Sequence, residues 1–179
     1  MKRLALLLAL AGCAAPETTV RTVPSLDLAR YQGVWHEVAR YPNRFEDGTG
    51  LDCVGVTATY APLPNGKLSV INRCINAADG NAPREARGQA YVVEGSGNAR
   101  LRVSFFWPFY GDYWVLGLAP DYAWAVVGDP ARDYLWVLSR TATLPPAAWE
   151  AAVASAVAQG FDPARLKRVA QPAVSSVAR

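Results

Sequence analysis

A succession of short β-like segments, separated by turn signals, is the feature that most constrains the fold. Each segment follows closely on the last, so neighbours are expected to be antiparallel, because a parallel crossover needs about a dozen or more residues. Closing such a series into a barrel removes the exposed sheet edges. The pattern predicts an all-β fold, an eight-stranded antiparallel up-and-down β-barrel. The expected strands cover residues 33–41, 53–60, 67–75, 85–93, 99–107, 112–118, 122–127 and 134–140.

One alanine-rich segment, residues 144–159, predicts a single C-terminal α-helix packed outside the barrel. Two prolines, Pro145 and Pro146, open it, and Gly160 stands where a C-terminal cap is expected. Its apolar face should contain Trp149, Val153 and either Val157 or Ala156. A last short strand is expected at residues 166–170.

The start of the chain is not expected to belong to the fold. Residues 1–12 combine a basic start with a short apolar stretch, a signal-peptide pattern that ends in Leu10-Ala11-Gly12-Cys13. This resembles the bacterial lipoprotein signal, which implies lipid attachment at Cys13 and an anchor in the outer membrane. The alternative is a plain secretory signal, with Cys13 incidental. Residues 13–25 then form the lipidated tether, residues 26–172 the folded domain and residues 173–179 a tail.

Charge and residue counts exclude several classes of function. The formal charge of +3 includes Lys2 and Arg3 in the leader, and no basic run with interleaved aromatic residues suggests nucleic-acid binding. The only histidine, His36, disfavours a zinc site and a Ser-His or Cys-His catalytic pair. No metal site and no cofactor are expected. No run of about 18 apolar residues suggests a membrane-spanning helix.

If Cys13 is acylated, an even number of cysteines remains, Cys53 and Cys74. Export places them in an oxidising compartment, where a disulfide is the usual state. Each lies on an expected strand, and the two strands are joined by a turn at Pro64-Asn65-Gly66. We therefore predict a cross-strand Cys53–Cys74 disulfide, worth about 3 kcal/mol in the loop-entropy model.

Three sequence blocks resemble the lipocalin family, in particular its apolipoprotein D-like bacterial outer-membrane members. They are the Gly33-Val34-Trp35 opening of the first strand, residues 103–113, and residues 133–140 with their terminal arginine. The resemblance spans roughly residues 27–172. It implies that Trp35 plugs the barrel floor and that Arg140 stacks across it, both in structural roles.

Alternation along the strands indicates which side chains line the interior. Arg140 facing inward puts Leu138, Trp136 and Tyr134 on the same face. On the strand at residues 99–107, the polar Arg102 and Ser104 indicate the outward face. The inward residues of this strand then include Phe105 and Trp107. On the next strand alternation leaves the Tyr113 face and the Trp114 face as alternatives. The predicted ligand-binding residues are Phe105, Trp107, Tyr113, Tyr134, Trp136 and Leu138.

Residues 53–60 and 67–75 give conflicting faces for Cys53 and Cys74, so one of these strands should contain a bulge. No ligand contacts are assigned there.

The leading hypothesis for function is a lipid-anchored protein that binds a small hydrophobic ligand, such as a fatty acid or lysophospholipid, for storage, transport or scavenging. A structural envelope lipoprotein with a filled barrel is one alternative. A lipocalin-type enzyme is another, but Glu37 would be its single inward carboxylate, without a visible acid-base partner. The oligomeric state stays open, a homodimer included.

Overall fold

The computed structural model describes residues 19–172. The signal peptide, Cys13, the first part of the tether and the tail at 173–179 lie outside the described residues. What we expect of them remains a prediction from the sequence.

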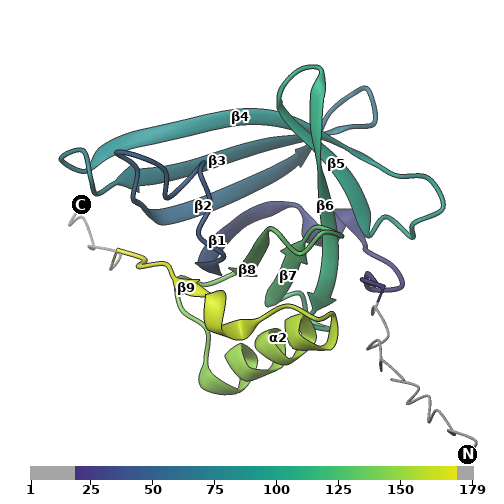
Figure 1. Cartoon of the computed structure of the whole chain (residues 1–179). Coiled ribbons are helices and arrows are strands. Elements are labelled where there is room, and N and C mark those ends of the chain that lie inside the picture. Colours follow the sequence, from purple (N-terminus) through teal and green to yellow (C-terminus); the bar gives the residue numbers. More distant parts are fainter. Residues whose placement is uncertain (1–18, 173–179) are drawn as a thin grey trace, which may run out of the picture.

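Eight antiparallel strands pair in chain order and close into a barrel, as predicted (Figure 1). Closure occurs at β1, which pairs with β2 on one side and with β8 on the other. The two-residue β9 (Lys167–Arg168) adds to the far end of β1. The barrel strands are β1 (Gly33–Arg40), β2 (Cys53–Pro62), β3 (Leu68–Asn76), β4 (Ala82–Val92), β5 (Arg100–Phe106), β6 (Phe109–Leu118), β7 (Trp124–Gly128) and β8 (Leu135–Ser139).

The predicted helix is α2 (Pro146–Ala158), which packs outside the barrel against β6 and β7. Its fully buried residues are Ala152 and Ala156, whereas Val157 is 47% exposed. Of the two alternatives for the apolar face, Ala156 is therefore correct and Val157 is wrong. Small alanine side chains let the helix lie close to the sheet.

Three short elements flank the barrel. The helix α1 (Leu28–Tyr31) precedes β1 and is capped by the Asp27 carboxylate, which accepts from two backbone amides. A 3-10 turn, η1 (Pro163–Arg165), follows α2 and leads to β9. Of these, only the last short strand was expected from the sequence, although β9 is shorter than predicted.

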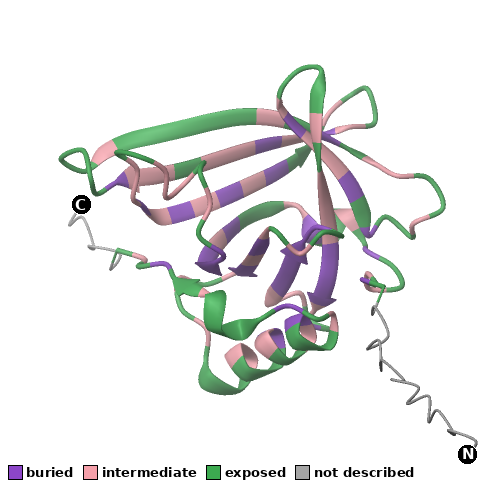
Figure 2. Cartoon of the chain, viewed as in Figure 1, coloured by how far each residue is buried: buried purple, intermediate pink, exposed green. Residues whose placement is uncertain are grey.

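The apolar core has two main parts. One fills the barrel around Trp35 and Tyr31, and the other lies between the barrel wall and α2, around Val126 and Phe161. Burial is concentrated in β1 and β6–β8, whereas most of β4 is exposed on both faces (Figure 2). The barrel is thus tightly packed on one side and open to solvent on the other.

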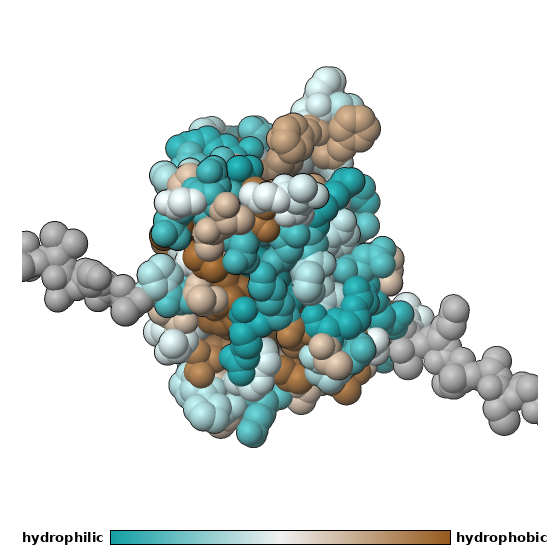
Figure 3. Space-filling view, turned by 60° about the vertical axis from the view of Figure 1, so that its left-hand side comes forward, coloured by the Kyte–Doolittle hydropathy of each residue, from teal (hydrophilic) through white to brown (hydrophobic). Residues whose placement is uncertain are grey.

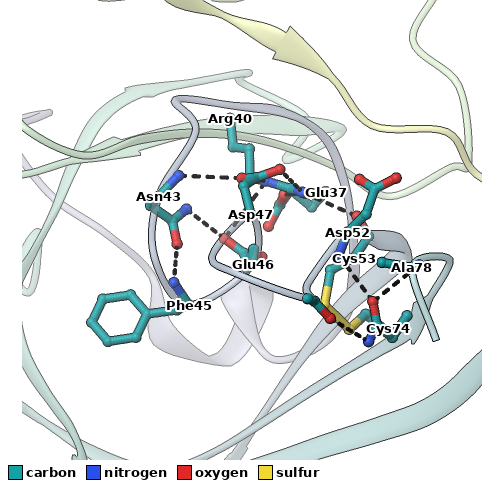
Figure 4. Close-up of a disulfide and its surroundings, with 12 residues drawn as sticks. Glu37, Arg40, Asn43, Phe45, Glu46, Asp47, Asp52, Cys53, Cys74 and Ala78 are labelled. Atoms are coloured by element: carbon teal, nitrogen blue, oxygen red, sulfur yellow. Dashed lines mark hydrogen bonds and ion pairs between the residues drawn. A yellow bond between two sulfur atoms is a disulfide. The ribbon is translucent and has the colours of Figure 1, made fainter.

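The conflict between the faces of Cys53 and Cys74 is resolved by a bulge in β2. The register with β3 shifts between Val54 and Thr57, and Gly55 in between has a φ of +60°. The extra residue brings the cysteines together in the predicted Cys53–Cys74 disulfide, with 5.4 Å between their Cα atoms (Figure 4). The disulfide pins the start of β2 to β3.

Among the described residues, no helix is long and apolar enough to cross a membrane.

Candidate functional site

The closed end of the barrel is built on Trp35. Its indole is fully buried and donates through Nε1 to the Tyr31 carbonyl at 2.8 Å. The Arg140 guanidinium lies over the indole, 3.8 Å from the ring centroid. That guanidinium also donates to the carbonyls of Val34 at 2.9 Å and Arg30 at 2.6 Å. One side chain from the end of β8 therefore holds α1 and β1 together.

Three tyrosine hydroxyls meet inside the barrel above this floor. The Tyr113 hydroxyl lies 2.7 Å from that of Tyr31 and 2.8 Å from that of Tyr60. Burial is the main cause that raises the pKa of all three phenols, so each keeps its proton at neutral pH. Three hydroxyl hydrogens serve two hydrogen bonds, which leaves one donor for a further acceptor.

The inner face of β6 is open at Gly111, which is itself exposed. Gly111 pairs with Val103 on the face that carries Tyr113, and a Cβ added at Gly111 would meet nothing within 4 Å. Val103 and Phe105 pack against the interior core, yet both remain only partly buried. On β3, the Asn72 Oδ1 is buried and has no hydrogen-bond partner in the described chain. The inner face of β6 therefore has open space at Gly111, and β3 carries a buried amide oxygen without a partner in the described chain.

A buried charged cluster closes one side of the opposite end. The Arg40 side chain is fully buried and donates to Glu37 at 2.8 Å, to Asp47 at 2.6 Å and to the Cys53 carbonyl at 3.1 Å (Figure 4). Asp47 also accepts from Lys167 of β9 at 2.7 Å. The cluster fixes the long β1–β2 loop against the barrel and next to the disulfide.

The carboxylates of this cluster have opposite pKa shifts. Burial opposes ionisation of Asp47, but hydrogen bonds from Arg40 and Lys167 lower its pKa well below the usual range. At Glu37, burial and the nearby Glu46 carboxylate raise the pKa despite the contact with Arg40. Asp47 is therefore the main counter-charge of Arg40.

The same loop contacts two of the predicted ligand-binding residues. The Trp136 indole donates through Nε1 to Glu46 at 3.1 Å, and Tyr134 stacks on Trp136 with 5.7 Å between ring centroids. Phe45 of the loop packs against Tyr134. These contacts place an aromatic pair beneath the loop, next to the charged cluster.

The structure brings most of the predicted ligand-binding residues to the interior. Phe105, Tyr113, Trp136 and Leu138 all pack with the interior core, which selects the Tyr113 face of β6. Trp107 does not belong with them, because it is 83% exposed at the tip of the β5–β6 hairpin. The register shifts between Val103 and Phe106, so alternation no longer holds there.

Three residues of the site, Tyr31, Tyr60 and Asn72, were not expected from the sequence. Tyr31 lies in the short α1, which has no strand-like periodicity. Tyr60 and Asn72 lie on the strands whose faces conflicted before the bulge was located. The only sequence signal for these three residues is that each side chain carries a polar group.

Comparison with known proteins agrees with this architecture. A model of the lipocalin-like domain matches residues 26–171. The chain belongs to the lipocalin-like family. It is 41% identical over 157 residues to the outer membrane lipoprotein Blc of Escherichia coli K12, covering 88% of this chain and 86% of that protein. It is also 37% identical over 161 residues to temperature-induced lipocalin-1 of Arabidopsis thaliana, covering 85% and 83%.

Solved lipocalin structures share the fold. Insecticyanin from the tobacco hornworm Manduca sexta superposes with a TM-score of 0.67 at 18% identity, over 84% of this chain and 83% of that one. Lobster apocrustacyanin A1 gives a TM-score of 0.65 at 16% identity, over 89% and 94%.

Within residues 19–172, no three His, Cys, Asp or Glu side chains are arranged to hold a metal ion. His36 lies 3.4 Å from the Gln171 side chain, and the inward carboxylate Glu37 is bonded to Arg40.

Removing the guanidinium at the floor should destabilise the fold. Arg140→Ala deletes the stack on Trp35 and leaves two carbonyls unpaired, so the free energy of unfolding should fall by roughly 1–3 kcal/mol. Arg165→Ala is the matched control, because Arg165 also stacks on an aromatic ring, that of Tyr41, but is itself exposed and makes one long hydrogen bond of 3.4 Å. Denaturant unfolding measures both. Equal losses in the two variants would contradict the role given to Arg140.

The raised pKa of Glu37 makes stability depend on pH. Because its pKa in the folded chain lies above the ordinary 4.5, protonation favours folding, and this contribution declines as pH rises from 4.5 through the folded pKa. Glu37→Gln resembles the protonated form and does not titrate. Its melting temperature relative to the native chain should therefore rise as the pH increases above about 4.5.

Thermal unfolding across this range tests the prediction, with exposed Glu94→Gln as the control. Asp47 contributes to both proteins and cancels in the comparison. A Glu37→Gln variant that loses stability progressively with pH would show instead that Glu37 is ionised in the fold.

Proposed function

We propose that this chain is a lipid-anchored lipocalin that binds a small hydrophobic ligand, such as a fatty acid or lysophospholipid, in the barrel. The observation that carries the proposal is the open space at exposed Gly111, on the face of β6 that also carries Tyr113, whose hydroxyl meets those of Tyr31 and Tyr60. Apolar side chains form most of this interior. Such a cavity favours an elongated apolar molecule, because transfer of its surface from water stabilises the complex.

Polar groups inside the barrel add a preference for an amphipathic ligand. The tyrosine hydroxyls have one donor available, and the Asn72 amide oxygen has no partner among the described residues. A head group or an ordered water could satisfy both, whereas a pure hydrocarbon would leave them unpaired. A carboxylic acid or a glycerol-bearing lipid matches this combination of donors and acceptors.

Anchoring at the outer membrane forms part of the proposal. It is supported by Leu10-Ala11-Gly12-Cys13 and by similarity to proteins named outer membrane lipoprotein Blc. Five residues separate Cys13 from Thr19, and a chain of this length spans at most about 20 Å. An acylated Cys13 would hold the barrel at the membrane surface, where ligand storage, transport or scavenging can take place.

The two alternative functions receive less support. A purely structural lipoprotein would not need open space at Gly111 or an unpaired Asn72. An enzyme would need an acid-base pair facing the cavity, and Glu37 is instead bonded to Arg40. A binding protein is therefore the function that we propose.

Filling the interior should weaken binding of long chains. Gly111→Trp adds bulk where a side chain meets no neighbour, so the variant should fold. In the native protein, saturated fatty acids should bind at one per barrel. Affinity should rise with chain length, since each buried methylene is worth about 0.8 kcal/mol before ordering costs. In Gly111→Trp this rise should stop at shorter chains. Calorimetric titration of the delipidated protein measures it.

Val34→Trp is the control, because Val34 is 49% exposed on β1 and lies outside the interior core. The control should keep the native dependence on chain length. Failure of every chain length to bind the native protein would overturn the fatty-acid proposal. An unchanged length dependence in a folded Gly111→Trp variant would show that the ligand does not occupy this space.

Substituting Cys13 tests the anchor. Cys13→Ser removes the thiol that would be acylated, so metabolic labelling with a radioactive fatty acid should be abolished, and the leader should not be cleaved by the lipoprotein signal peptidase. Cys53→Ser with Cys74→Ser is the control and should still be labelled. Normal labelling of the Cys13→Ser protein would contradict lipid attachment at this residue.

A further inference from the structure

The barrel wall is interrupted between β4 and β5. The strand β4 pairs with β3 from Ala82 to Ala90, but pairs with β5 only at residues 89–92. Residues 83–87 of β4 are exposed on both faces (Figure 2). Beyond Gln89 the two strands diverge, and the β5–β6 hairpin continues away from β4 (Figure 1).

An open pocket of about 420 Å³ lies where the strands diverge. It combines cationic, polar and aromatic side chains with one glycine, and it contains no acidic residue. Its lining residues are Lys67, Arg87, Gly88, Gln89, Ser104, Phe105, Trp107 and Tyr110. Of the predicted ligand-binding residues, Phe105 and Trp107 belong to this lining.

The charges around the pocket do not balance. Lys67 has no ion pair within residues 19–172. Arg87 binds Glu85 at 2.6 Å, but Glu85 also binds Arg73 at 2.7 Å, so one carboxylate serves two guanidinium groups. On the neighbouring strand β6, Asp112 pairs with Arg102. An excess of positive charge therefore faces the pocket, and this favours an anion.

A buried hydroxyl lies unpaired in the same pocket. Ser104 is 8% exposed, and its Oγ has no hydrogen-bond partner in the part of the chain that the structure describes. Two residues earlier on the same face, Arg102 Nε is likewise buried and unpaired. A buried donor without an acceptor is costly, and an anionic oxygen would satisfy it with a charge-assisted hydrogen bond.

Apolar surface extends from the pocket to the tip of the β5–β6 hairpin. Phe105 and Trp107 line the pocket, and Phe106 and Phe109 beside them are each 77% exposed. Figure 3 shows hydrophobic side chains projecting from the top of the molecule, where this hairpin ends in Figure 1. An alkyl chain attached to an anion in the pocket would find apolar surface along this tip.

We propose that the pocket between β4 and β5 is a second binding site, for the anionic head group of a single-chain amphiphile. Lys67, Arg87 and Ser104 hold the phosphate or carboxylate, and the aromatic tip holds the start of the chain. The site is distinct from the barrel interior that the proposed function uses, although Phe105 contacts both.

Calorimetric titration with octyl phosphate tests this site, using residues 14–179 exported so that the disulfide forms. Lys67→Gln and Ser104→Ala should each weaken binding about tenfold, the effect of losing one hydrogen bond to a charged group. Ser104→Ala should not lower the melting temperature, because it removes a hydroxyl that has no partner. Arg21→Gln, an exposed change of equal charge, and Ser69→Ala are the matched controls and should bind normally.

Two further ligands and one variant identify what the site accepts. Octyltrimethylammonium should not bind there, and inorganic phosphate should bind much more weakly than octyl phosphate. Gly111→Trp should leave unchanged the binding of octyl phosphate that depends on Lys67. The pocket between β4 and β5 can therefore be detected even if no ligand enters the barrel. Equal affinity for inorganic phosphate, or octyl phosphate binding that ignores Lys67→Gln and Ser104→Ala, would overturn the proposal. Loss of all octyl phosphate binding in Gly111→Trp would also overturn it and would assign the ligand to the barrel alone.

Discussion

Closure of the sheet through β1 is the constraint on which the rest of the structure depends. The first half of β1 pairs with β2, and its second half pairs with β8, with His36 in register with both neighbours. Without β1, the two end strands would expose unpaired edges. The Trp35–Arg140 contact lies at this junction, because Arg140 follows β8 and binds carbonyls of β1 and α1. The contacts of the barrel floor and the strand pairing that closes the barrel therefore depend on the same residues. Loss of one set of contacts would destabilise the other.

The register shift in β1 links this closure to the chemistry of the opposite end. Pairing with β8 shifts between Glu37 and Ala39, which changes the face that follows along the strand. Val38 and Ala39 pack outside, in the core beneath α2, while Glu37 and Arg40 bond to each other. The buried guanidinium requires counter-charges, and Asp47 supplies the main one from the β1–β2 loop. One irregular residue thus determines where the loop is held.

The two ligand sites that we propose differ in their physical basis. The interior offers apolar surface and a few neutral hydroxyl and amide groups, so its selectivity would come from chain length and shape. The pocket between β4 and β5 has unbalanced positive charge and an unpaired buried hydroxyl, so its selectivity would come from the charge of the head group. The hairpin β5–β6 contributes to both, because Tyr113 faces inward and Trp107 lines the outer pocket.

Local sequence determined the elements of this protein. Alternating residues and turn signals were sufficient to predict eight strands in the correct order. Pro146 and Gly160 were sufficient to predict where the helix begins and ends. Both kinds of signal act within a few residues. The even number of exported cysteines was sufficient for the disulfide, and conflicting faces were sufficient to show that a bulge exists.

Only the tertiary structure decided which side chains meet. Alternation predicts which face of the sheet a residue points to only until a bulge shifts the register. For this reason the spacing of residues could not predict the exposed position of Trp107 or the contact of Glu37 with Arg40. The three tyrosines come from α1, β2 and β6, and nothing local relates them. Their hydroxyls meet because barrel closure fixes the register of distant strands, and contacts across a barrel follow from that register.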